Sequence, residues 1–153
     1  MATSTLIQVL DSGVSGSTSH RQEVETFLAG GTIAVGDWVS FDTSQAGADR
    51  VLYVIEAPGV ATVGNAAAFG VSLDAVTAGQ RVRVVTAGYC ASASVAAATV
   101  AGSPLIGPIG TAGEAAIEAP STGGSSGTTG KLCGIALEAD TANLAAVWVI
   151  KSF

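Results

Sequence analysis

The sequence contains an internal repeat that extends over most of the chain after residue 30. Four short segments recur in the same order, each 62 to 67 residues further along. The matched pairs are Thr32–Gly36 with Thr99–Gly102, Ile55–Pro58 with Ile117–Pro120, Gly70–Ala75 with Gly134–Ala139, and Val82 with Val147. This period predicts two copies of one supersecondary unit, over about residues 32–85 and 99–151. Two such units can pack together and cover the sheet edges that each would leave open alone.

Short apolar runs separated by glycine, serine and asparagine indicate β-strands within each unit. Residues Arg81–Val84 alternate polar and apolar side chains, the pattern of a half-buried strand. Helical signals are limited to Ser19–Leu28, where a capping-box spacing leaves a short helix and an extended arm equally compatible with the sequence. We expect an all-β fold, a compact β-barrel or β-tulip built from two duplicated β units. Residues 31–153 would form this single domain, and residues 1–30 an N-terminal arm.

The charge balance narrows the range of partners. Lys and Arg number 6, Asp and Glu number 12, and the net charge is −6. Nucleic acids and anionic membranes both require a basic surface, so direct binding to either is not expected. The N-terminus shows no basic segment followed by a long apolar run, as secretory signals do. We therefore expect synthesis in the cytoplasm of the host cell.

No residue pattern points to an enzyme. Four carboxylates, Glu56, Glu118, Asp74 and Glu138, lie at repeated positions, which favours a role in turns and strand edges over catalysis. Catalytic residues, cofactors and a small-molecule substrate are therefore not expected. A function specific to this chain would sit outside the repeat.

Two cysteines, Cys90 and Cys133, form no CxxC pair, and together with the single histidine they are too few for a four-ligand zinc site. We expect two small buried thiols in a reducing compartment. A disulfide between them is the alternative. No metal site is expected.

The segments Gly36–Val39, Ala68–Ala75, Gly79–Val84 and Cys133–Ala139 resemble the small capsid decoration, or cement, proteins of tailed bacteriophages. The resemblance implies a compact β-barrel or β-tulip, commonly trimeric, that binds the major capsid protein on the outside of the head and stabilises the lattice. The protein would then be located on the capsid exterior of the virion. Another structural subunit (tail or fibre) or a β-barrel adaptor is the alternative, and a small enzyme is least favoured.

The N-terminal arm is the expected capsid-binding element, because closure of the repeat does not require it. It holds two apolar groups on either side of a Gly/Ser-rich linker, Ser12–Ser19. The expected contact residues are Leu6, Ile7, Val9, Leu10, Val24, Phe27 and Leu28. Such an arm can add a strand to an open sheet edge of the capsid protein or of a neighbouring copy. The alternative is that Thr5–Leu10 pairs with the edge of its own barrel.

Overall fold

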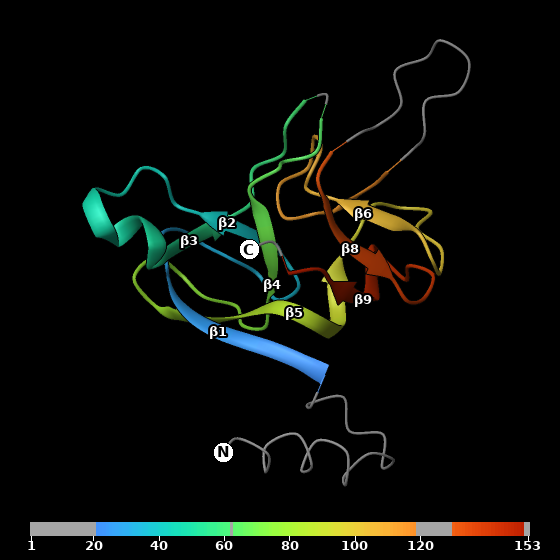
Figure 1. Ribbon diagram of the computed structural model, residues 1–153, viewed down its shortest axis with the longest axis horizontal. Coiled ribbons are helices and arrows are strands. Elements are labelled where there is room, and N and C mark those ends of the chain that lie inside the picture. Colours follow the sequence, from blue (N-terminus) through green and yellow to red (C-terminus); the bar gives the residue numbers. More distant parts are fainter. Residues whose placement is uncertain (1–20, 62, 119–129, 152–153) are drawn as a thin grey trace, which may run out of the picture.

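The computed structural model describes residues 21–61, 63–118 and 130–151, and in these ranges the chain is all-β (Figure 1). The expected fold class is confirmed. The strands are β1 (Gln22–Ala29), β2 (Trp38–Phe41), β3 (Tyr53–Glu56), β4 (Ala68–Ser72), β5 (Arg81–Ser94), β6 (Pro104–Ile106), β7 (Ala116–Ile117), β8 (Leu132–Ala136) and β9 (Leu144–Val149). A short 3₁₀ helix, η2 (Gly47–Val51), precedes β3. Within the described ranges, no helix is long and apolar enough to cross a bilayer.

Five strands close into a barrel, in the order β1-β3-β2-β4-β5. Strand β1 completes the circle because it pairs in parallel with β3 and antiparallel with β5. Closure removes the open edges that an isolated sheet would present to other chains. The barrel occupies the left half of the molecule in Figure 1.

A second sheet continues from the barrel through β5. This strand has 14 residues, and its C-terminal half pairs with β9 after its N-terminal half has paired with β1 and β4. Strands β8, β6 and β7 follow β9 in that order. Gly88 lies where β5 passes from β1 to β9, opposite both Gln22 and Val149. Its φ of +89° lies in the left-handed region, and a Cβ there would collide with the carbonyl oxygen of Arg21, so only glycine fits this position.

The two repeated segments have the same strand order. The first runs β3-β2-β4-β5 and the second β7-β6-β8-β9, and every pairing within them is antiparallel. Val39 lies opposite Gly70 just as Leu105 lies opposite Gly134, and a register shift follows at the same place in both ladders. This agreement supports the expectation of a duplicated unit. Superposition of the two segments stays a prediction.

The strand ladders correct two details of the repeat. Glu118 corresponds to Ala57 rather than to Glu56, because the N–H of Ala57 donates to Trp38 and the N–H of Glu118 donates to Pro104, the residue that matches Trp38.

The other detail is the residue that matches Val147. Val84 lies opposite Ser72, and Val147 lies opposite Ala136, the matching residue of the second unit. Val147 therefore corresponds to Val84 rather than to Val82. The sequence match was displaced by two residues, which keeps the same side of a strand because side chains alternate with period two.

The boundary of the N-terminal arm was wrong. Residues 22–29 are strand β1 of the barrel, so the barrel does need part of the first 30 residues to close. The helical alternative fails over the same residues, because β1 gains a ladder with β5 that extends from Gln22 to Leu28. Residues 1–20, which include Thr5–Leu10, lie outside the described residues.

Three phenylalanines pack together in the barrel. Phe41 from β2 and Phe69 from β4 stack with ring centroids 4.4 Å apart, and Phe27 from β1 meets them edge-on at 6.0 and 5.6 Å. Such offset and edge-on pairs add to the stabilisation that burial alone provides. Phe27 and Phe41 pack against the buried residues of this cluster, which include Phe69, Val39, Val54 and Val82.

A second core joins the barrel to the second sheet, and Trp38 is its largest side chain. The indole is fully buried, and its Nε1–H donates a hydrogen bond to the carbonyl oxygen of Ser94 at 3.0 Å. A Cβ at Gly134 would come within 3.0 Å of the Trp38 ring and of the Trp148 carbonyl oxygen. Glycine at this repeated position thus leaves room for the ring of the other unit.

The place of Phe27 gives a test of the corrected boundary. We expect Phe27→Ala to lower the free energy of unfolding by about 2 kcal/mol, less than the roughly 3–5 kcal/mol of a fully buried phenylalanine, because this side chain is only partly buried. Val24→Thr, on the exposed side of β1, should stay within about 0.5 kcal/mol of wild type. Urea denaturation measures the free energy of unfolding of both variants. Equal stability of the two variants would contradict the placement of β1 in the barrel.

Candidate functional site

The repeated carboxylates of the two hairpins have a structural role. Asp74 Oδ2 accepts a hydrogen bond from the backbone N–H of Arg83 at 2.9 Å, and Glu138 Oε1 accepts one from the N–H of Ala146 at the same distance. Both bonds connect the end of one strand to the next strand. The Arg83 guanidinium also binds Asp74 through two nitrogens and holds the pKa of this carboxyl below its ordinary value. This is the turn role expected from their repetition.

A second pair of carboxylates lies at the junction between the two units. Asp37 Oδ1 and Glu56 Oε1 come within 3.0 and 2.8 Å of the point where Gly113 would carry a Cβ. Gly113 itself is bound to the first unit, since its N–H donates to Ala57 and its carbonyl oxygen accepts from Trp38, both at 2.9 Å. Two negative charges therefore face one glycine of the connecting loop.

The environment of this pair raises both pKa values. Burial raises the pKa of Asp37 above its ordinary 3.8, although a hydrogen bond from Ala34 opposes the change. Burial, and then the charge of Asp37, raise the pKa of Glu56 above its ordinary 4.5. Both shifts disfavour the ionised forms in the folded protein.

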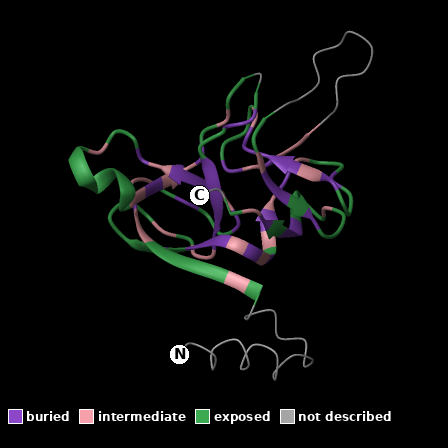
Figure 2. Cartoon of the chain, viewed as in Figure 1, coloured by how far each residue is buried: buried purple, intermediate pink, exposed green. Residues whose placement is uncertain are grey.

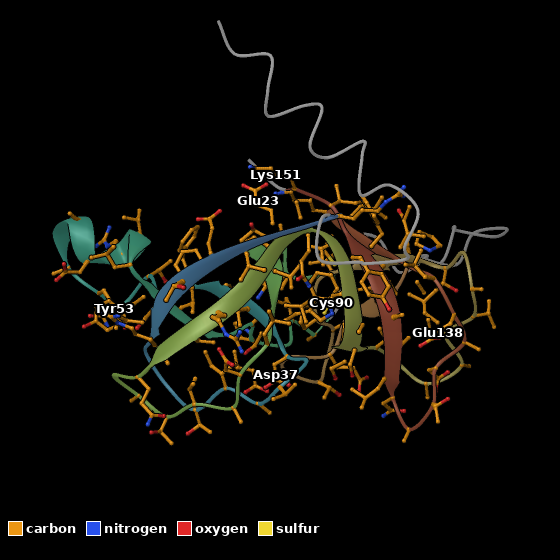
Figure 3. The ribbon with its side chains drawn as sticks, turned by 90° about the horizontal axis from the view of Figure 1, so that it is seen from below. Glu23, Asp37, Tyr53, Cys90, Glu138 and Lys151 are labelled. Carbon is orange, nitrogen blue, oxygen red and sulfur yellow. The ribbon has the colours of Figure 1, made fainter. Side chains whose placement is uncertain are left out.

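The two cysteines are buried and unbonded. Burial raises the pKa of Cys133 to about 12, so its thiol stays protonated at neutral pH. The expectation of two buried thiols is met, with Cys90 close to the middle of the molecule in Figure 3. Over the described ranges, no three His, Cys, Asp or Glu side chains gather where a metal ion could be held.

The residues expected to bind the capsid do not form one surface. Leu6, Ile7, Val9 and Leu10 lie outside the described residues. In β1, Phe27 packs against the barrel core and Leu28 is half-buried, whereas Val24 is exposed on the outer side of the strand. Figure 2 shows β1 as mostly exposed, whereas β4 is buried along its whole length.

An apolar surface that the sequence did not single out lies on the second sheet. Tyr89 of β5 is directly opposite Trp148 of β9, which is opposite Ile135 of β8, which is opposite Pro104 of β6. Directly opposite residues point to the same face, so these four side chains form a row across the sheet. Trp148 and Ile135 are 38% and 37% exposed.

The row is extended along β8 and β9 by alternate residues of the same face. Leu137 and Leu144 are exposed, and the small, buried Ala146 lies between Leu144 and Trp148 along β9. We call this surface the outward face, and its residues are Tyr89, Pro104, Ile135, Leu137, Leu144, Ala146 and Trp148. None of them is charged. Contiguous exposed apolar side chains of this kind mark interaction surfaces more often than single ones do.

Charged residues lie at the edges of the outward face. A shallow hollow beside Trp148 is lined by Arg21, Gln22, Glu23, Ala87 and Gly88. Glu23 forms an ion pair with Lys151 at 2.7 Å, and the two lie side by side in Figure 3. Glu138 lies at the other end of the face. The arrangement is an apolar centre with a charged rim, which is the composition of protein interfaces.

Comparison with known proteins identifies a solved structure with a similar fold. No protein-family model matches the sequence, and no curated protein matches it. Among solved structures, the fold is similar to the N base of the head fiber gp8.5 of bacteriophage phi29, with a TM-score of 0.50 and 14% sequence identity. The similarity covers 85% of this chain and 95% of that chain. The two proteins share a fold.

The junction carboxylates predict a pH dependence. A carboxyl with a higher pKa in the folded state binds its proton more tightly there, so folding loses stability as pH rises from the ordinary pKa to the folded one. We expect Glu56→Gln to unfold at a higher temperature than wild type at pH 7, with the difference shrinking toward pH 4, because the variant lacks the buried negative charge. Thermal melts across this range measure the effect.

The control is Glu118→Gln, which removes the carboxylate that the sequence repeat aligns with Glu56 and for which the structure gives no neighbouring Asp37 charge. It should not reproduce the pH-dependent gain. If the difference in unfolding temperature between Glu56→Gln and wild type were the same at every pH, the ionised Glu56 carboxylate would not destabilise the folded protein.

Proposed function

We propose that this chain is a structural protein of a phage virion, and specifically a decoration protein that binds the outside of the head and stabilises its lattice. The observation that carries the proposal is the shared fold with the N base of a phage head fiber. The resemblance of Ala68–Ala75 and Cys133–Ala139 to decoration proteins supports the same placement independently. The partner would be the major capsid protein, and the protein would assemble as a homotrimer on the capsid exterior.

The surface of the domain agrees with this role. Charged residues make up only 12% of the sequence, and the outward face carries none. Interface centres are depleted of charge because each buried charge must be desolvated. Two of the four repeated carboxylates, Asp74 and Glu138, are engaged in hairpins, which favours a structural role for them over a catalytic one.

The base of a head fibre is the second candidate, and the similarity to the N base of gp8.5 favours it. The two roles differ in how many copies a head carries. A decoration protein occupies sites that repeat over the whole lattice, whereas a fibre base serves a separate projecting element. The number of copies per head therefore distinguishes them.

Purified heads should contain this chain in a copy number comparable to that of the lattice sites, on the order of the number of capsid-protein hexamers or more, because a lattice-binding protein is repeated by the symmetry of the shell. Quantitative mass spectrometry of heads against the major capsid protein measures the ratio. Copies far below one per capsid hexamer favour the fibre base. Absence from purified heads would exclude both roles.

Removal of residues 1–12 tests the expected attachment segment. The truncated protein should keep its thermal midpoint, because the barrel begins at Gln22, and should lose binding to undecorated heads. Thermal melts and co-sedimentation with heads measure the two properties. Full binding by the truncated protein would show that Leu6–Leu10 does not hold the capsid.

A further inference from the structure

We infer that the outward face of the second sheet binds the η2 tip of a second copy of this chain, so that copies join end to end in a closed ring. The η2 tip is the segment Asp49–Leu52. The inference names the surfaces through which the proposed homotrimer would form. It does not require that the protein binds a head, and its test is carried out in solution.

The outward face has the residue types that dominate binding energy at protein interfaces. Trp148 and Tyr89 lie side by side on opposed strands, with Ile135 on the far side of Trp148. Tryptophan and tyrosine are enriched among the residues whose truncation weakens binding most. They are held by a sheet whose inner side is fully packed, so the face is rigid before a partner arrives.

The η2 tip supplies a complementary apolar projection. Val51 and Leu52 are adjacent and are 62% and 51% exposed, and η2 contains no buried residue. Figure 1 places η2 at one end of the molecule and the second sheet at the other. The tip cannot fold back onto the face of its own chain, so only a second molecule can bring the two together.

Charge selects this pairing of surfaces. At the rim of the outward face, Arg21 lines the hollow beside Trp148 and forms no ion pair with any described residue. At the tip, Asp49 precedes Val51 and Leu52 and likewise forms no ion pair within the described ranges. Its neighbour Arg50 is held by its own segment, since its Nε–H donates to the carbonyl oxygen of Gln45 at 2.7 Å. With Leu52 against Trp148, Asp49 of one copy would meet Arg21 of the next.

The contact joins two different surfaces, which determines the kind of assembly. A contact between unlike surfaces repeats from copy to copy and forms a ring when the rotation closes. Three copies would place each outward face against the tip of its neighbour. Each ring would then leave no apolar centre of this kind exposed to water.

Charge reversal provides the test. Native mass spectrometry and sedimentation equilibrium should show a trimer for the full chain, and Asp49→Arg or Arg21→Asp should each weaken association roughly tenfold or more, because like charges would then face each other across the contact. The double variant should return to within about threefold of wild type, since it restores an opposite pair. Trp148→Ser should also weaken association.

Two controls keep the result interpretable. Thermal melts of the charge variants should match wild type, because Asp49 and Arg21 are exposed, and those of Trp148→Ser should show that it is still folded at the temperature of the assay. Glu114→Arg should leave association unchanged. A wild-type monomer, single reversals without effect, or a double variant that fails to recover would each overturn the inference. So would a Trp148→Ser protein that stays trimeric but no longer binds heads, because the face would then belong to the capsid protein. A trimer unaffected by any of these variants would leave the proposed function standing and remove only this pairing of surfaces.

Discussion

Strand β5 provides backbone hydrogen-bonding partners to three other strands, and the architecture depends on this sharing. Its first half holds β1 on one ladder and β4 on another, and its second half holds β9. A single strand of 14 residues thus belongs to a closed barrel and to a sheet that leaves the barrel. Because the barrel and the second sheet share the backbone of β5, this strand and the packing of Trp38 determine where the second sheet lies relative to the barrel.

The two repeated units differ in how they cover their outer strand. In the first unit β3 pairs with β1, a strand from outside the repeat, and this pairing closes the barrel. In the second unit the corresponding strand β7 pairs only with β6 among the described residues, and it has two residues. One duplicated pattern has therefore produced a closed barrel on one side and an open sheet on the other. The open sheet is the one that carries the outward face.

The sequence predicted what depends on local pattern and missed what depends on pairing between distant segments. The recurrence of Gly70 as Gly134 and of Asp74 as Glu138 identified matching hairpins, because a strand and its turn are encoded in a few adjacent residues. Strand β1 was assigned to an arm because it lies outside the repeat, whose closure did not require it. Its partner on β5 is about 60 residues away. Trp148 presented a different difficulty, since both faces of β9 are apolar and alternation alone does not say which one is covered.

The ion pair between Glu23 and Lys151 brings the first and last strands of the fold to one corner of the molecule. The first and last of the described strands therefore end close to each other at that corner. A short linker between these two ends would join β9 to β1 without disturbing a ladder, and the exposed turn at Ala78 and Gly79 would offer new ends. A circularly permuted chain would connect the strands in a different order but could keep the same strand pairing. The barrel and its attached sheet could therefore be built from such a chain.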